Sequence, residues 1–259
     1  MIELDKIYLG DCIDLMKEIP DESIDAIICD LPYNTTGLKW DCAIPFEDLW
    51  NAYKRIIKRD GAIVLFCQQP FTTYLISSNI GMYRYNWIWE KEMGTNFVNA
   101  NYCPLKKTED IAVFGYGAIS YHRGTIRMKY NPQKTKGKPY VCKNGNKKDT
   151  VYSVLHNDSG VCGYVTVNNG DRYPTNILRF NRDRKKLHPT QKPVDLVRYL
   201  VRTYTNKNDV VLDNCCGSGT TAIACIREKR HYICMEKDET FYDVACKRVK
   251  EELREPKLF

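Results

Sequence analysis

The tetrapeptide Asp30-Leu31-Pro32-Tyr33 places an acid, a rigid turn and an aromatic ring directly after a short apolar run, residues 25–29. Such a run is typical of a buried strand, and ligands of open α/β folds bind at the carboxyl ends of the strands. The acid and the ring would therefore lie where a ligand binds. Taken alone, however, the tetrapeptide has the default interpretation of an ordinary proline turn.

A second motif combines a predicted buried strand, a glycine turn and a helix start between Val211 and Thr221. Gly217 and Gly219 would let the backbone approach a ligand closely. No lysine follows Gly219, which argues against a P-loop, and Ala222 replaces the third glycine of the dinucleotide fingerprint. Glu236 ends the next predicted strand, where a carboxylate can accept hydrogen bonds from both hydroxyls of a ribose. The alternative for Glu236 is a solvated carboxylate at a strand end.

The third motif, His188-Pro189-Thr190-Gln191-Lys192-Pro193, stands directly before a predicted helix. Its two prolines stiffen the segment, and the free amide groups of a helix start together with Lys192 suit a carboxylate ligand. By itself the hexapeptide has a simpler interpretation, a linker followed by a helix.

Strands and helices alternate around these motifs. Predicted strands cover residues 6–9, 25–29, 61–66, 83–89, 111–114, 210–212 and 231–235, and predicted helices cover residues 13–19, 45–58, 194–201, 220–230 and 241–253. This alternation predicts an α/β fold with a doubly wound, mostly parallel sheet. Residues 115–181, rich in Gly, Asn, Lys and Tyr, follow neither period and receive no assignment.

The charge of the chain is concentrated in its middle. Residues 121–192 hold sixteen Lys and Arg but only four acids, a net charge of +12, whereas the remainder carries −5. A basic segment within a mildly acidic body suits a polyanion, most simply nucleic acid. The alternative is a solvated, lysine-rich loop region.

Composition excludes several other classes of protein. The 259 residues are 43% hydrophobic, too many for a disordered chain, and no uncharged apolar run approaches the roughly 20 residues that cross a bilayer. The acidic start is unlike a signal peptide. The twelve cysteines are scattered without C-x-x-C or zinc-finger spacing, so we expect buried thiols in a reducing cytoplasm and no metal site.

In their order along the chain, the three motifs resemble those of the DNA amino-methyltransferases, S-adenosylmethionine-dependent enzymes that methylate N6 of adenine or N4 of cytosine. The order is similar to that family's beta class, with the D-P-P-Y-type motif first and the F-x-G-x-G-type motif last. The resemblance implies a Rossmann-like catalytic domain formed by residues 1–120 and 188–259, with a target-recognition insert at 121–187. Without Lys192, which this assigns to the cofactor site, the insert carries about +11.

The resemblance also implies how the target base is held. Asp30 and the backbone carbonyl of Leu31, where the family usually has proline, would accept hydrogen bonds from its amino group. Pro32 would keep the turn rigid, and Tyr33 would stack on a base flipped out of the duplex. Methyl transfer would then be a direct in-line displacement that depends mainly on positioning.

For the cofactor, the resemblance implies that Glu236 holds the ribose and Asp11 the adenine amino group. Asp213 would lie near the methionine amino group, and Cys215 stands where the family usually has a phenylalanine that packs on the cofactor. The remaining residues assigned to S-adenosylmethionine are Thr190 and Lys192, near the methionine carboxylate, and Gly217, Gly219 and Thr220 of the glycine turn.

Some residues receive a weaker interpretation. Glu109 precedes a predicted strand and is interpreted as a solvated cap. Trp40, Phe66, Trp87 and Trp89 would shape a base pocket, although such aromatic residues are more often part of the core.

The leading hypothesis is a site-specific adenine-N6 methyltransferase of double-stranded DNA, because in the family an Asp at position 30 favours adenine and a Ser favours cytosine. The alternative on the same scaffold is N4-cytosine methylation, and an RNA substrate stays open. From a different class, a catalytically decayed nucleic-acid-binding module is disfavoured because Asp30, Tyr33, Gly217, Gly219 and Glu236 are all present. A homodimer and a cognate restriction endonuclease are expected from the resemblance only.

Overall fold

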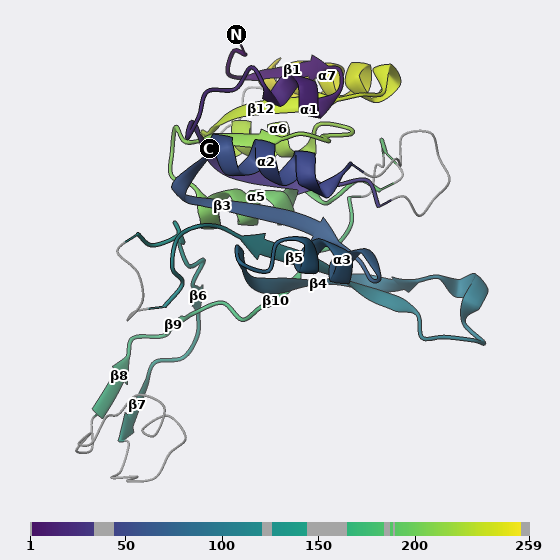
Figure 1. The fold of residues 1–259 in the computed structure, drawn as a ribbon. Coiled ribbons are helices and arrows are strands. Elements are labelled where there is room, and N and C mark those ends of the chain that lie inside the picture. Colours follow the sequence, from purple (N-terminus) through teal and green to yellow (C-terminus); the bar gives the residue numbers. More distant parts are fainter. Residues whose placement is uncertain are drawn as a thin grey trace. The chain divides into compact units, whose positions relative to one another are not determined.

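The computed structural model describes residues 2–33, 44–120, 126–143, 165–183, 187–188 and 190–254. The chain divides into two compact units, Met1–Asn131 with Asn176–Phe259, and Pro132–Thr175. Along the chain the elements are β1 (Lys6–Leu9), α1 (Cys12–Met16), β2 (Ile24–Asp30), α2 (Phe46–Ile56), β3 (Ile57–Cys67), α3 (Phe71–Ser78), β4 (Tyr83–Thr95), η1 (Phe97–Asn99), β5 (Lys106–Phe114), β6 (Thr135–Lys136), β7 (Tyr140–Lys143), β8 (Val165–Asn168), β9 (Asp171–Arg172), β10 (Ile177–Arg179), α5 (Val194–Tyr204), β11 (Val210–Asp213), α6 (Thr220–Glu228), β12 (His231–Glu236) and α7 (Glu239–Arg254) (Figure 1).

The larger unit is built on an eight-stranded sheet in the order β1-β12-β11-β2-β3-β5-β4-β10. Neighbouring strands run parallel except that β5 is antiparallel to both β3 and β4. This arrangement confirms the predicted doubly wound, mostly parallel α/β fold. From β11 the chain proceeds to β12 on one side, and from β2 to β3 on the other. The switch point, where such folds bind ligands, therefore lies between β11 and β2.

Helices cover both faces of this sheet, which explains why β2 is buried along almost its whole length. Successive side chains of a strand point to opposite faces, so Ala26 and Ile28 pack in one hydrophobic cluster while Ile27 and Cys29 pack in the other. The first cluster includes side chains of α5, α6 and α7, and the second includes side chains of α1, α2 and α3.

Three strands are longer than the sequence predicts. β3 begins at Ile57, β4 continues to Thr95 and β5 begins at Lys106, so β4 and β5 extend together as a hairpin (Figure 1). The added residues of the hairpin include several charged side chains, so they lack the apolar alternation on which the prediction relied. Helix α3 was also missed, because it follows Pro70 and lacks a clear apolar stripe.

The middle of the chain contains short strands. β10 joins the large sheet beside β4, whereas β6 pairs with β9 and β7 with β8 in two ribbons of the smaller unit. That unit covers residues 132–175 and is therefore shorter along the chain than the predicted insert at 121–187.

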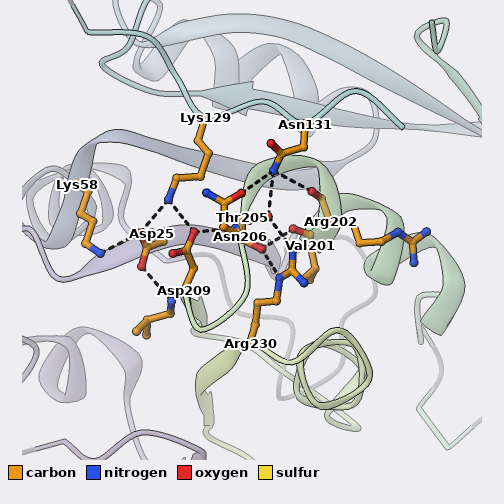
Figure 2. A network of polar contacts seen from close by, with 11 residues as sticks. Asp25, Lys58, Lys129, Asn131, Val201, Arg202, Thr205, Asn206, Asp209 and Arg230 are labelled. Atoms are coloured by element: carbon orange, nitrogen blue, oxygen red, sulfur yellow. Dashed lines mark hydrogen bonds and ion pairs between the residues drawn. The ribbon is translucent and has the colours of Figure 1, made fainter. Parts of the chain in front are cut away.

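The chain segment that leads to the smaller unit is fixed at the amino ends of β2 and β11. Lys129 donates to Asp25 and Asp209, at 3.0 and 2.6 Å, and Asp25 also accepts from the Val210 N–H (Figure 2). The side-chain amide of Asn131 donates to the carbonyls of Arg202 and Thr205 (Figure 2). A buried charge is costly unless it is paired, so the ion pairs of Asp25 with Lys58 and Lys129 hold this segment at the amino ends of the two strands.

Candidate active site

A cavity of about 550 Å³ lies at the carboxyl ends of the parallel strands, within the range of volumes that hold a small ligand. It is lined by the loops after β1, β2, β11 and β12 and by the segment before α5. The fold thus brings the three sequence motifs to one place. The predicted site residues that line it are Asp11, Asp30, Leu31, Pro32, Tyr33, Thr190, Lys192, Asp213, Cys215, Gly217, Thr220 and Glu236.

Glu236 and the glycine turn form one hydrogen-bonded unit. The Gly217 N–H donates to the Glu236 carboxylate at 2.8 Å, and the backbone N–H groups of Lys237 and Asp238 donate to it at 2.9 Å. Burial raises the pKa of Glu236, although these N–H donors oppose the shift. The carboxylate is therefore fixed at the cavity wall, with acceptor capacity left for a ligand hydroxyl.

Gly217 and Gly219 both have left-handed backbone, with φ of +52° and +78°. A Cβ on Gly217 would lie 3.5 Å from the His188 ring, which also lines the cavity. A Cβ on Gly219 would lie 3.1 Å from the Cβ of Ala245 in α7 instead, and Gly219 is not among the lining residues of the described part of the chain. Gly219 thus packs against α7, and its contact with the cofactor stays a prediction.

Asp213, at the end of β11, is buried with few donors. Thr221 Oγ1 donates to its carboxylate at 2.5 Å and the Cys215 N–H at 3.2 Å. Burial raises the pKa of Asp213 to about 7. A cationic ligand group beside this carboxyl would favour its ionised form.

Asp11 is already engaged by other groups of the protein. Its carboxylate accepts from the Ile13 N–H at 3.0 Å and so caps α1, and it lies 3.0 Å from Lys237 Nζ. The hydrogen bond from Lys237 lowers the pKa of Asp11, so the group is an anion at neutral pH. The predicted contact with an adenine amino group would use the acceptor capacity that remains.

Asp30 ends β2 between two hydrogen-bond donors. Tyr33 Oη donates to Asp30 Oδ1 at 2.7 Å, and Lys192 Nζ donates to Asp30 Oδ2 at 2.5 Å. Burial raises the pKa of Asp30, and the Lys192 ammonium opposes that shift. The Tyr33 ring stacks on Phe71 with centroids 4.8 Å apart, which fixes the aromatic wall of the cavity beside the acid.

Lys192 was expected near a ligand carboxylate, but its ammonium is bound to protein groups. Besides Asp30 it lies 3.6 Å from Glu109 Oε2 and 5.3 Å from the centroid of Phe66, which lines the cavity. Although burial lowers the pKa of Lys192, the two carboxylates raise it above the usual value. The ammonium is therefore charged, and its closest partner is the predicted catalytic acid.

Glu109, which forms an ion pair with Lys192, was missed at the level of the sequence. It lies within β5, opposite Trp89, with only 15% of its side chain exposed, so the interpretation as a solvated cap was wrong. Side chains two residues apart share one face of a strand, which puts Glu109 on the same side as Ile111 and Val113 of the core. The two-residue spacing from Ile111 could have placed Glu109 on the core face, but only if the strand was predicted to begin before residue 111.

The cavity also includes His188 of the third motif, a side chain with no predicted role. The His188 ring packs edge-on against Phe241, with centroids 4.1 Å apart, and burial lowers the pKa of His188 to about 4. This imidazole is therefore neutral at pH 7. Of the aromatic residues considered for the base pocket, Phe66 lines the cavity, Trp87 and Trp89 are core residues, and Trp40 lies outside the described residues.

The cysteines are free thiols at all ten described positions. Most are buried as expected, but Cys103 and Cys142 are exposed. Cys215 lies at the cavity, where the side-chain amide of Asn214 is 3.5 Å from both its sulfur and that of Cys12. A thiol pair thus occupies the wall at which the predicted family has an aromatic ring. In the described part of the chain, no cluster of three or more His, Cys, Asp or Glu is arranged to hold a metal ion.

The fold and the cavity together define a ligand-binding α/β protein with an acid and an aromatic ring beside a glycine turn. A family model described as DNA methylase, for enzymes acting on N6 or N4 amino groups, matches residues 24–247. The chain belongs to this family. The resemblance inferred from the motifs is thereby confirmed, including S-adenosylmethionine as the methyl donor.

Similar proteins include type II DNA methyltransferases. The chain is 28% identical over 254 residues to M1.MboII of Moraxella bovis, covering 90% of this chain and 92% of that one. It is 29% identical over 262 residues to M.BglII of Bacillus subtilis, covering 93% of this chain and 68% of the relative.

Solved structures share the fold at lower identity. The crystal structure of the M1.HpyAVI–SAM complex matches with a TM-score of 0.60 and 22% identity, covering 94% of this chain and 98% of that one. PvuII DNA methyltransferase, which is cytosine-N4-specific, matches with a TM-score of 0.63 and 15% identity, covering 95% and 90%. None of the helices in the described ranges is long and apolar enough to span a membrane.

Proposed function

We propose that this protein is a site-specific methyltransferase that transfers a methyl group to N6 of a flipped adenine in double-stranded DNA. The observation that carries the proposal is the Asp30 carboxylate, fixed at the cavity wall between Tyr33 and Lys192. The donor is S-adenosylmethionine, which when bound supplies an electrophilic methyl group on a sulfonium.

The residues around the cavity fit that donor. Glu236 offers a buried carboxylate for the ribose hydroxyls, and Asp213 offers one for the methionine amino group. Gly217 lets the chain pass close to the ligand because no side chain stands between its backbone and the cavity. Asp11, Thr190, Cys215 and Thr220 complete the wall.

On the side of the target base, Asp30 acts on the nucleophile. The lone pair of an exocyclic amino group is delocalised into the ring, so the nitrogen is weakly nucleophilic. Hydrogen bonds from its two N–H groups to Asp30 and to the Leu31 carbonyl would draw it towards tetrahedral geometry. The carboxylate also stabilises the positive charge that develops on the nitrogen. Flipping the base costs a few kcal/mol, which stacking on Tyr33 helps to offset.

We further propose that residues 121–187 contact the DNA. In the smaller unit, cations lie over exposed tyrosine rings: Lys134 Nζ is 4.5 Å from the Tyr173 centroid, and the Arg172 guanidinium is 4.9 Å from the Tyr140 centroid. Such pairs suit phosphate contacts combined with stacking. The homodimer and the cognate restriction endonuclease stay predictions from the family resemblance.

N4-cytosine methylation is the alternative, since the PvuII enzyme shares the fold. The proposed substrate class is tested by incubating the purified protein with methyl-labelled S-adenosylmethionine and duplex DNA, single-stranded DNA or RNA. We expect incorporation into the duplex at the highest kcat/KM. Label that enters RNA in preference to duplex DNA would overturn the proposal.

A further inference from the structure

Four charged side chains of alternating sign form a buried row that ends at the cavity. Lys91 Nζ lies 2.5 Å from Glu109 Oε1, Glu109 Oε2 lies 3.6 Å from Lys192 Nζ, and Lys192 Nζ lies 2.5 Å from Asp30 Oδ2. The exposed fractions of the four side chains are 7%, 15%, 9% and 21% in the same order.

Burying such a row of charges lowers the stability of the folded protein. Taking a charge out of water costs several kcal/mol per ion, and apolar side chains of similar volume would fill the space as well or better. Lys91 stands two residues after Trp89 in β4, and Glu109 stands two residues before Ile111 in β5. Both side chains therefore lie on the strand face that packs in the core. Of the two, neither is among the described residues that line the cavity. Their effect on a ligand must therefore pass through Lys192.

We propose that Glu109, held by Lys91, is a positioning residue that fixes the Lys192 ammonium on Asp30. This inference rests on the proposed function, in which Asp30 receives the amino group of the target base. The Lys192 ammonium donates hydrogen bonds to Asp30 and to the Thr190 carbonyl, and its third partner is Glu109 Oε2, an ion pair at 3.6 Å that is longer than a hydrogen bond. With carboxylates on two sides, the ammonium has one stable position, and the Asp30 carboxylate is oriented by it.

The pKa of Asp30 reports whether Glu109 and Lys192 act on its carboxylate, and the comparison of kcat with donor affinity reports whether Glu109 positions it. Lys192 lowers the pKa of Asp30, whereas the Glu109 carboxylate raises it. Substitutions that neutralise these two side chains should therefore shift the pKa of Asp30 in opposite directions. The titratable groups that interact electrostatically with Asp30 include Cys29 of β2, Tyr33 of the loop after it, Cys67 of β3, Glu109 of β5, Lys192 before α5 and Asp213 of β11.

The test compares Glu109→Gln and Lys192→Met with Glu90→Gln. Glu90 is the matched control, because it is an acid of the neighbouring strand β4 that pairs with Lys107 and Arg179 away from the cavity. The pKa of Asp30 is followed in ¹³C NMR titrations of the side-chain carboxyls, with its signal assigned by its loss in Asp30→Asn. We expect a lower value in Glu109→Gln, a higher value in Lys192→Met and no change in Glu90→Gln.

Activity gives the second readout. In Glu109→Gln we expect kcat to fall by about tenfold while the Kd for S-adenosylmethionine stays within about twofold, because an orienting contact is lost and the donor site is intact. If Glu109→Gln does not fold, the double variant Lys91→Met/Glu109→Gln removes both charges, and we expect the same fall in kcat.

Two results would overturn the inference: an Asp30 titration in Glu109→Gln equal to that of Glu90→Gln, or a kcat of the double variant equal to that of wild type. Because the NMR titration needs no substrate, it decides the inference even if the wild-type protein methylates a different base. Failure of the proposed function would be seen in a separate measurement, in which the wild-type protein transfers no methyl group to adenine in DNA.

Discussion

The Gly217 N–H donates a hydrogen bond to the Glu236 carboxylate at 2.8 Å. This bond joins the loop after β11 to the last residue of the neighbouring parallel strand β12. The acid proposed to hold the ribose is thus oriented by the glycine turn proposed to pass beneath the donor, so neither can move without the other. Two predictions concern this unit.

Glu236→Gln should weaken the binding of S-adenosylmethionine by about 10- to 100-fold, because a neutral amide replaces a charged acceptor for the ribose hydroxyls. Isothermal titration calorimetry measures the change. Glu239→Gln, at the exposed start of α7, is the matched control and should bind as wild type does. Equal affinities of the two variants would show that Glu236 does not hold the donor.

Gly217→Ala and Gly219→Ala should differ in their effects. Both place a side chain on left-handed backbone, which costs roughly 1–2 kcal/mol of stability. Only Gly217→Ala should also lower donor affinity, because Gly217 lines the cavity and Gly219 packs against Ala245. Denaturant unfolding and calorimetry separate the two quantities. A larger loss of donor affinity in Gly219→Ala would contradict the assignment.

Much of this site could be predicted from sequence because its residues stand in local motifs at strand ends. Asp30, Asp213 and Glu236 each end a buried strand, and parallel strands bring such ends to one edge. The pairing of Lys192 with Asp30 could not be predicted in this way, since 162 positions separate the two residues. For Gly219 the sequence does not distinguish two causes, because a glycine is required whether a ligand or α7 approaches the backbone.

The ionisation of Asp213 should make stability depend on pH. Because its pKa in the fold is raised to about 7, the folded protein binds a proton that the unfolded chain has released above about pH 4. This contribution to stability is present below pH 4 and is lost as the pH rises through 7. Asp213→Asn lacks it, so the variant should gain stability relative to wild type between pH 4 and 8, by roughly 4 kcal/mol at most.

Chemical unfolding of both proteins across this pH range checks the prediction for Asp213. A constant difference in free energy of unfolding would mean that Asp213 titrates at its ordinary pKa.

Asp30→Ala should abolish methyl transfer, with kcat lowered by at least about 100-fold, because the acceptor that activates the amino nitrogen is gone. Donor affinity should change little, since Asp30, which bonds to Tyr33 and Lys192, is proposed to contact the base and not the donor. Single-turnover kinetics and calorimetry together check this. Parallel loss of transfer and of donor binding would instead place Asp30 in the donor site.

The identity of the methylated base tests the central claim most directly. Duplex DNA containing all sequence contexts is incubated with the protein and S-adenosylmethionine, digested to nucleosides and analysed by mass spectrometry, with Asp30→Ala as the inactive control. We expect N6-methyladenine with wild-type protein and none with the variant. N4-methylcytosine without N6-methyladenine would contradict it.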